Sequence, residues 1–286
     1  MKAEIAAAKD ATSARFVDAA RSGDFSLVRR LASKVPEINA LVEQRDLRFT
    51  TALIEACRRG HKEIVAELLK LGADPEVQDR HQYYAEPQRR RAIHHAAEKG
   101  RIEVCRLLIA NHAKLDPKDS GKQTPLMLSV WGGHLGVIEL LLDSGVDISK
   151  SAGVLNAAIS NQSRYHNGKL VVSKERCEQI IDLLLERGCN PGTPDDVGTT
   201  PLMSSIRRSD VDFIKKLHKF GASLDAQDKR GWTVLMKATN LRQHKIIGYL
   251  ISAGARMDLK NRDGHTALDI ALRKKDHETA KILGRS

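Results

Sequence analysis

The sequence predicts an all-α solenoid of stacked helix pairs joined by β-hairpin loops. Three observations carry this prediction: one pattern recurs about every 33 residues, each copy holds two short apolar segments with helical spacing, and turn residues separate the copies. The fullest copies are TALIEACRRGHKEIVAELLKLGAD, from Thr51, and TPLMLSVWGGHLGVIELLLDSGVD, from Thr124.

Eight copies can be aligned on the residue that opens each one, which we call the marker residue. Successive markers lie 33 residues apart in three cases and 29 to 47 residues apart in the others. We expect a frayed segment or a short extra helix over residues 1–13 and a single repeat domain over 14–286. The markers are Ala14, Thr51, Arg91, Thr124, Gly153, Thr200, Thr233 and Thr266.

Each copy carries the start and stop signals of two helices. In the fourth copy, Thr124 is an N-cap residue with Pro125 in the first turn, and Gly145 stands where a left-handed C-cap closes the second helix. Between copies, Asp228 to Gly231 and Asn261 to Gly264 supply the turn residues of hairpins. Helices of about ten residues are marginal alone, so stability must come from stacking on neighbouring copies.

This pattern resembles the ankyrin repeat, which has a T-P-L-H-x-A-A opening, a G-H turn and a V-V-x-x-L-L-x-x-G-A-D close. The resemblance covers about residues 14–283. It implies that partners bind along a concave face formed by the hairpin tips and the first helix of each copy. It also implies that His61, His94 and His134 bond neighbouring backbone and support the fold. The first and last copies depart from the pattern, as capping repeats do.

The composition is that of a globular protein with a basic surface. Apolar residues make up 41%, charged residues 29% and aromatic residues 4%, and 47 basic residues against 36 acidic ones give a net charge of +11. No apolar stretch approaches the length of a membrane helix, so we expect no membrane insertion. The charge favours acidic proteins, nucleic acid or anionic lipid as partners without choosing among them.

The four cysteines indicate a reducing compartment. None forms a C-x-x-C pair, and several fall at apolar core positions of the repeat. We therefore expect an intracellular protein, cytoplasmic or nuclear, with free thiols. The cysteines are Cys57, Cys105, Cys177 and Cys189.

Two insertions interrupt the repeat. The first, RHQYYAEPQRRR, lengthens the hairpin before the third copy and is expected to display Tyr83, Tyr84, Arg89, Arg90 and Arg91. Tyrosine beside arginine is typical of interfaces, which favours a binding role. The second insertion covers about residues 161–175 between the two helices of the fifth copy. There a tolerated surface loop is the favoured interpretation.

The residue pairs before the G-H turn concentrate the basic charge. Among their sixteen residues, eight are basic and one is acidic. Trp131 belongs to this row and Trp232 lies at a hairpin tip beside Arg230, both at positions expected to be exposed. The alternative is that each tryptophan covers an adjacent hairpin. The candidate partner-binding residues are Arg58, Arg59, Tyr83, Tyr84, Arg89, Arg90, Trp131, Arg207, Arg208, Arg230 and Trp232.

No catalytic, cofactor or metal signature accompanies the repeat. The sequence contains no H-E-x-x-H, G-x-S-x-G, phosphate loop or dinucleotide fingerprint. We therefore expect a non-enzymatic scaffold or adaptor, monomeric by itself, that binds an acidic or phosphorylated protein segment on its basic concave face. RNA binding through the same surface is the alternative. A recognition domain within a larger protein is a third hypothesis.

Overall fold

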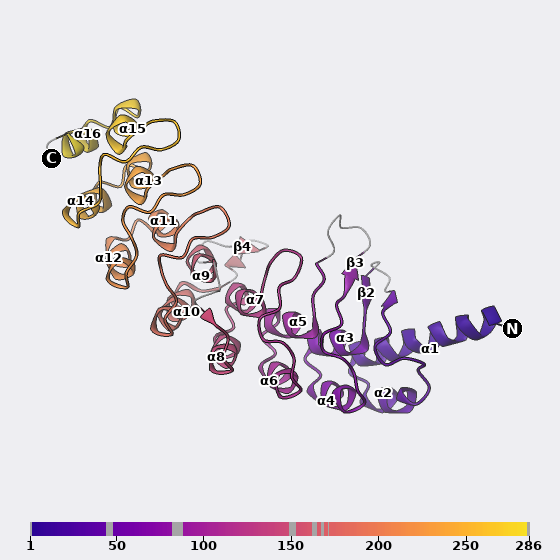
Figure 1. Ribbon diagram of the computed structural model, residues 1–286. Coiled ribbons are helices and arrows are strands. Elements are labelled where there is room, and N and C mark those ends of the chain that lie inside the picture. Colours follow the sequence, from indigo (N-terminus) through magenta and orange to yellow (C-terminus); the bar gives the residue numbers. More distant parts are fainter. Residues whose placement is uncertain are drawn as a thin grey trace. The chain divides into compact units, whose positions relative to one another are not determined.

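The chain forms two compact units in the computed structural model, residues 1–146 and residues 147–286 (Figure 1). Each consists of helix pairs joined by extended loops. The described residues are 2–43, 48–81, 88–148, 153–161, 165–166, 169–170 and 172–284.

In the first unit, four helix pairs stack so that first helices pack on first helices and second helices on second helices. A small antiparallel sheet of order β1-β2-β3 belongs to its hairpins, with Val42 opposite Thr50 and Arg48 opposite His81. The elements are α1 (Lys2–Ser22), α2 (Phe25–Ala32), β1 (Val42–Glu43), β2 (Arg48–Thr50), α3 (Ala52–Arg59), α4 (Lys62–Lys70), β3 (Arg80–His81), α5 (Ala92–Glu98), α6 (Ile102–Ala110), α7 (Pro125–Gly132) and α8 (Leu135–Asp143).

The second unit repeats this arrangement, with first helices α9, α11, α13 and α15 packed in sequence. Its elements are α9 (Val154–Asn161), β4 (Tyr165–His166), β5 (Lys169–Leu170), α10 (Lys174–Glu186), α11 (Pro201–Ser205), the 3₁₀ helix η2 (Ile206–Arg208), α12 (Val211–Lys219), α13 (Val234–Asn240), α14 (His244–Ser252), α15 (Ala267–Arg273) and α16 (His277–Leu283). The predicted solenoid class is confirmed.

The marker threonines start the first helices, as the sequence predicts. In each case the hydroxyl accepts the backbone N–H three residues later, at 3.2 Å from Thr51 to Ile54 and at 3.3 Å from Thr200 to Met203. An N-cap of this kind satisfies an otherwise unpaired helix N–H group. Thr124, Thr233 and Thr266 make the same bond.

The G-H histidines of the second and fourth copies join these copies to the ones before them. His61 Nε2 lies 3.1 Å from the carbonyl of Arg21, and His134 Nε2 lies 3.0 Å from the carbonyl of Glu98. His94 reaches the Pro117 carbonyl at 3.0 Å. The structural role predicted for these three histidines is confirmed.

Aliphatic side chains fill the core between the layers. Ile54, Leu68, Leu126, Ile138 and Leu184 are among the largest fully buried side chains. All four cysteines are buried free thiols. Burial raises the pKa of Cys105 to about 12 and that of Cys189 to about 11, which keeps both thiols protonated.

The ends and insertions refine the prediction. Helix α1 runs without interruption from Lys2 to Ser22, so residues 2–13 continue the first helix of the first copy. The second insertion contains the β4–β5 antiparallel pair, with Tyr165 opposite Leu170. It lies between α9 and α10, as expected. No helix among the described residues combines the length and apolar character needed to cross a bilayer.

Candidate functional site

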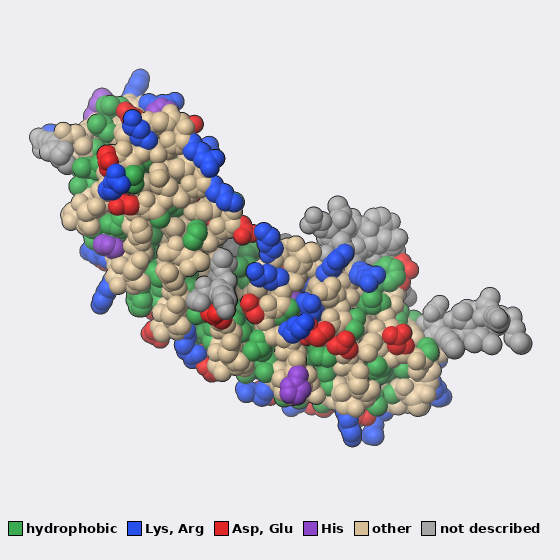
Figure 2. All heavy atoms as spheres, viewed as in Figure 1, with side chains coloured by type: hydrophobic (Ala, Val, Ile, Leu, Met, Phe, Trp, Pro, Cys, Tyr) green, Lys and Arg blue, Asp and Glu red, His purple; other side chains and the backbone are tan. Residues whose placement is uncertain are grey.

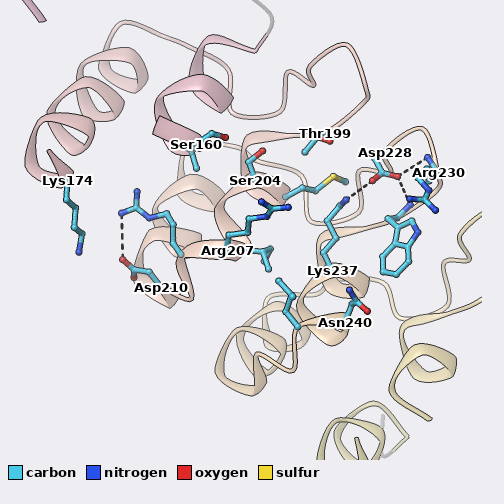
Figure 3. Close-up of a pocket in the computed structure, with 16 residues that line it drawn as sticks. Ser160, Lys174, Thr199, Ser204, Arg207, Asp210, Asp228, Arg230, Lys237 and Asn240 are labelled. Carbon is cyan, nitrogen blue, oxygen red and sulfur yellow. Dashed lines mark hydrogen bonds and ion pairs between the residues drawn. The ribbon is translucent and has the colours of Figure 1, made fainter. Parts of the chain in front are cut away.

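A groove of about 930 Å³ lies on the second unit (Figure 3). It runs over the first helices α9 and α11–η2 to the hairpin and helix of the seventh copy. We call it the 203–241 groove. Its lining residues are Ile159, Ser160, Lys174, Thr199, Met203, Ser204, Ile206, Arg207, Arg208, Asp210, Asp228, Arg230, Trp232, Lys237, Asn240 and Leu241.

Local structure fixes the groove walls. Thr200 and Thr233 are the N-caps of α11 and α13, so the two helices that line the groove begin at the same position of their repeats. Met203 and Ile206 line the groove and are buried, at 4% and 1% exposure. Arg207 and Arg230, by contrast, are exposed members of the lining.

Asp228 organises the hairpin wall. Its Oδ1 accepts the backbone N–H groups of Arg230 and Trp232, each at 2.9 Å, and its Oδ2 accepts Lys237 Nζ at 2.7 Å. Burial alone raises the pKa of Asp228, but the bonds from Lys237, Trp232 and Arg230 outweigh it, so the pKa lies below its usual value. Asp228 is therefore ionised at neutral pH and neutralises Lys237.

Arg208 is held by the chain itself. Its Nη2 lies 3.2 Å from Glu178 Oε1 and 4.0 Å from Asp210 Oδ2, and its guanidinium stacks 3.8 Å from the Phe213 ring centre. Only 10% of the side chain is exposed. The expectation that Arg208 is displayed to a partner is wrong, because internal carboxylates and an aromatic ring already occupy it.

Arg207 and Arg230 differ from Arg208. Both are exposed, both line the groove, and neither side chain has an ion pair within the described part of the chain. Figure 3 shows Arg207 reaching over the first helices and Arg230 standing at the hairpin. Two guanidinium groups without a carboxylate of their own are available to an external anion.

The groove is basic but mixed. Of the described residues that line it, Lys174, Arg207, Arg208, Arg230 and Lys237 are basic, whereas Asp210 and Asp228 are acidic. On the view in Figure 2, Lys and Arg side chains follow the hairpin edge of the second unit, while acidic and basic side chains intermingle on the first unit. The structure thus brings together Arg207, Arg208, Arg230 and Trp232 from the sequence-predicted set.

In the first unit, two arginines predicted to bind a partner form ion pairs within the chain instead. Arg58 lies 3.3 Å from Glu55 Oε1 and 3.7 Å from Asp79 Oδ2, with 14% of its side chain exposed. Arg90 pairs with Asp119 at 3.0 Å and is only 7% exposed. The expectation that Arg58 and Arg90 are displayed is therefore wrong, because each satisfies a carboxylate within the repeat stack.

The remaining predicted residues divide as follows. Arg59 and Arg89 are exposed, and within the described ranges neither side chain forms an ion pair. Trp131 is half-buried on α7, and Trp232 is half-buried in the groove. Arg91, which was expected to be displayed on the first insertion together with Arg89, forms an ion pair with Glu76 at 3.0 Å. Tyr83 and Tyr84 lie outside the described residues.

Sequence reasoning missed Lys174, Lys237 and Asp228 as groove residues. Lys237 and Asp228 could have been found from their places in the repeat, four residues after and five residues before marker Thr233. Lys174 follows the second insertion, where no repeat register applies. Within the described ranges, no group of three or more His, Cys, Asp or Glu residues could hold a metal ion.

Comparisons with known proteins agree with the repeat architecture. The family model described as ankyrin repeats in three copies matches residues 80–152, 170–261 and 210–285, and a single ankyrin-repeat model matches residues 50–80. The crystal structure of the ankyrin repeat domain of Bcl-3 superposes with a TM-score of 0.63 and 23% identity, covering 83% of this chain and 99% of that one.

Relatives match over part of their length. An ankyrin repeat and KH domain-containing protein of Caenorhabditis briggsae is 28% identical over 181 residues, which is 60% of this chain and 6% of that protein. The protein fem-1 homolog A-like of Mus musculus is 31% identical over 108 residues, 38% of this chain and 15% of that protein. The NF-kappa-B inhibitor cactus of Drosophila yakuba is 24% identical over 204 residues, 63% of this chain and 39% of that protein.

The family models cover more than half of the chain, in register with the helix pairs and hairpins described above. Ankyrin repeats are generally a non-enzymatic fold that serves protein interaction. This chain belongs to the ankyrin-repeat family.

Proposed function

We propose that this protein is a non-enzymatic adaptor whose second unit binds an acidic or phosphorylated segment of a partner protein in the 203–241 groove. One observation carries the proposal: Arg207 and Arg230 line the groove, and neither has a carboxylate partner within the described residues. Arginine guanidinium groups bind carboxylates and phosphoryl groups through paired hydrogen bonds.

The mixed character of the groove favours a protein segment over nucleic acid. Asp210 and Asp228 carry negative charge into the lining, and Met203, Trp232 and Leu241 add apolar surface. A phosphate backbone is bound best by rows of unpaired lysines and arginines. In the groove Arg208 is already paired with a carboxylate of the chain, and in the first unit Arg58 and Arg90 are paired in the same way.

The proposal places the protein inside the cell. Four buried free thiols suit a reducing compartment, where cysteines serve as small apolar side chains. Cytoplasmic and nuclear locations agree equally well with this chemistry.

Charge reversal in the groove tests the proposal. Fluorescence anisotropy would follow a labelled twelve-residue peptide of alternating Glu and Ser, and the same peptide with phosphoserine. The Arg207→Glu/Arg230→Glu variant should weaken binding about tenfold or more, because two charge-assisted contacts become repulsive. Thermal stability should stay close to wild type, since both side chains are exposed.

The matched control is Lys219→Glu/Lys245→Glu, which changes the net charge equally. Both lysines are exposed on the second helices α12 and α14, and neither lines the groove. Equal weakening by the two variants would mean that only net charge matters, and the groove assignment would be wrong. Tighter binding of a twelve-nucleotide RNA, with a steep salt dependence, would instead support the nucleic-acid alternative.

A further inference from the structure

The seventh copy places two large apolar side chains in the 203–241 groove. Leu241 follows α13 and is 50% exposed, and Trp232 lies two residues before the helix and is half-buried. Both line the groove. The exposed half of Leu241 contributes nothing to the core of its own copy.

Both side chains depart from the repeat. Eight residues after the marker, the other seven copies have Ser, Arg, Lys, Gly, Asn, Arg and Lys, and only the seventh has Leu. One residue before the marker, the other copies have Ser, Thr, Arg, Gln, Ala, Thr and His, and only the seventh has Trp. The pattern itself therefore requires neither side chain, and the seventh copy holds both.

The two apolar side chains stand at opposite ends of one helix. Trp232 and Leu241 are nine residues apart in the sequence, so a rise of 1.5 Å per residue, as in helix α13 between them, places them about 13 Å apart. An extended chain advances about 3.3 Å per residue, so roughly four residues cover that length. Arg230 adjoins Trp232 in the hairpin, and Arg207 faces the same groove from η2.

We propose that the groove binds an extended partner segment in which acidic residues lie between two large apolar side chains four positions apart. One apolar side chain packs on Trp232 and the other on Leu241, while the carboxylates between them face Arg207 and Arg230. Charge complementarity selects an acidic segment, and the spacing of Trp232 and Leu241 selects its apolar positions. This inference rests on the proposed function and narrows it to one class of segment.

Two labelled peptides of equal charge test the spacing. The first contains Ser-Leu-Asp-Glu-Asp-Leu-Ser, and the second contains Ser-Ser-Asp-Glu-Asp-Ser-Ser. By fluorescence anisotropy, wild type should bind the leucine peptide at least fivefold more tightly than the serine peptide. Leu241→Ser should reduce this ratio to less than half, and Leu241→Ser with Trp232→Ser should bring it close to one.

Two further variants make the test specific. Leu272→Ser replaces a leucine that is 56% exposed on α15 and does not line the groove, so it should keep the wild-type ratio. Arg207→Glu/Arg230→Glu should weaken both peptides and leave their ratio nearly unchanged. Because Leu241 is half exposed, Leu241→Ser should fold normally, and circular dichroism checks this.

The outcomes separate the two proposals. If wild type binds both peptides equally and Arg207→Glu/Arg230→Glu weakens both, the apolar spacing is wrong while the acidic-segment function stands. If Leu272→Ser lowers the ratio as much as Leu241→Ser, the apolar contact is non-specific and the inference fails. Absence of binding to either peptide at millimolar concentration overturns both proposals.

Discussion

Asp228 and Lys237 are joined by a 2.7 Å hydrogen bond between Oδ2 and Nζ, and this bond ties a hairpin to the helix that follows it. The other oxygen of the same carboxylate accepts the backbone N–H groups of Arg230 and Trp232. One side chain therefore sets the hairpin conformation and neutralises a groove lysine. Its hydrogen bonds to the backbone hold Arg230 and Trp232 in place.

Replacement of Asp228 should loosen this hairpin. Asp228→Ala removes the acceptor of three hydrogen bonds and should cost roughly 2 kcal/mol of unfolding free energy. Asp228→Asn should cost less, because Asn261 holds the next hairpin through the same two backbone bonds, at 3.0 and 2.9 Å. Urea unfolding measures the loss, and faster amide exchange at Arg230 and Trp232 locates it. Equal losses in the two variants would contradict the role of the backbone bonds.

Adjacent arginines in the first insertion should respond differently to truncation. Arg90→Ala leaves the Asp119 carboxylate, 2% exposed, without its cation and should cost about 3 to 5 kcal/mol. Arg89→Ala removes an exposed side chain and should stay within about 0.5 kcal/mol of wild type. Urea midpoints of the two variants provide the comparison. Similar midpoints would show that the Arg90–Asp119 pair contributes little.

The repeat predicts the fold of this chain well because local signals and tertiary packing agree. The marker residues Thr51, Thr124 and Thr233 are N-caps in the structure, and glycines such as Gly60 and Gly133 take the left-handed conformation after the first helix. Each of these features depends on a few neighbouring residues. The repeat pattern is therefore sufficient to predict a helix start or end, because residues close in the sequence determine the conformation there.

The site was less predictable because ion pairing depends on neighbouring copies. Arg90 meets Asp119, 29 residues ahead, and Arg208 meets Glu178, 30 residues behind. A count of basic residues in the predicted face includes such arginines, although the chain has already neutralised them. The number of basic residues counted from the sequence therefore overstates how many arginines a partner can reach.

Which member of an arginine pair faces solvent differs between two copies that also differ in helix type. In the second copy Arg58 is paired and Arg59 is exposed, whereas in the sixth copy Arg207 is exposed and Arg208 is paired. The first helix of the sixth copy ends in the 3₁₀ turn η2, which advances about 120° per residue instead of about 100°. The same dipeptide is thereby rotated, and the sequence carries no plain signal of that turn.

Stability should fall as the pH is lowered from 6.5 to 4 because of His94. Burial lowers the pKa of His94 to about 4, with the Asp119 charge acting in the opposite direction. Between these pH values the unfolded chain binds more protons at this position than the folded chain. The stabilisation is complete above pH 6.5, and roughly 3 kcal/mol is lost by pH 4.

Urea unfolding at pH 7.5, 6.5, 5.5 and 4.5 measures this dependence. His94→Gln should make the profile shallower, because its amide does not titrate and can still donate to the Pro117 carbonyl, while the pKa of His134, which burial also lowers, keeps part of the slope. Exposed His277→Gln serves as the control. The lowered pKa values of Asp79 and Asp228 act below 3.8, outside this window. A His94→Gln profile as steep as wild type would assign the dependence to other groups.

Glycine at position 275 should stabilise the last copy. Lys275 has a φ of 55°, in the left-handed region, at the place in the repeat where Gly60, Gly100 and Gly133 stand in earlier copies. A side chain in that region costs about 1 to 2 kcal/mol, and the greater freedom of glycine in the unfolded chain returns part of the gain. Lys275→Gly should therefore raise the unfolding free energy by about 0.5 to 1 kcal/mol.

Lys274, the exposed C-cap beside Lys275, has a φ of −84°, so Lys274→Gly should lower stability instead. Thermal unfolding of the two variants should show midpoint shifts of opposite sign, and shifts of the same sign would contradict the argument from backbone conformation.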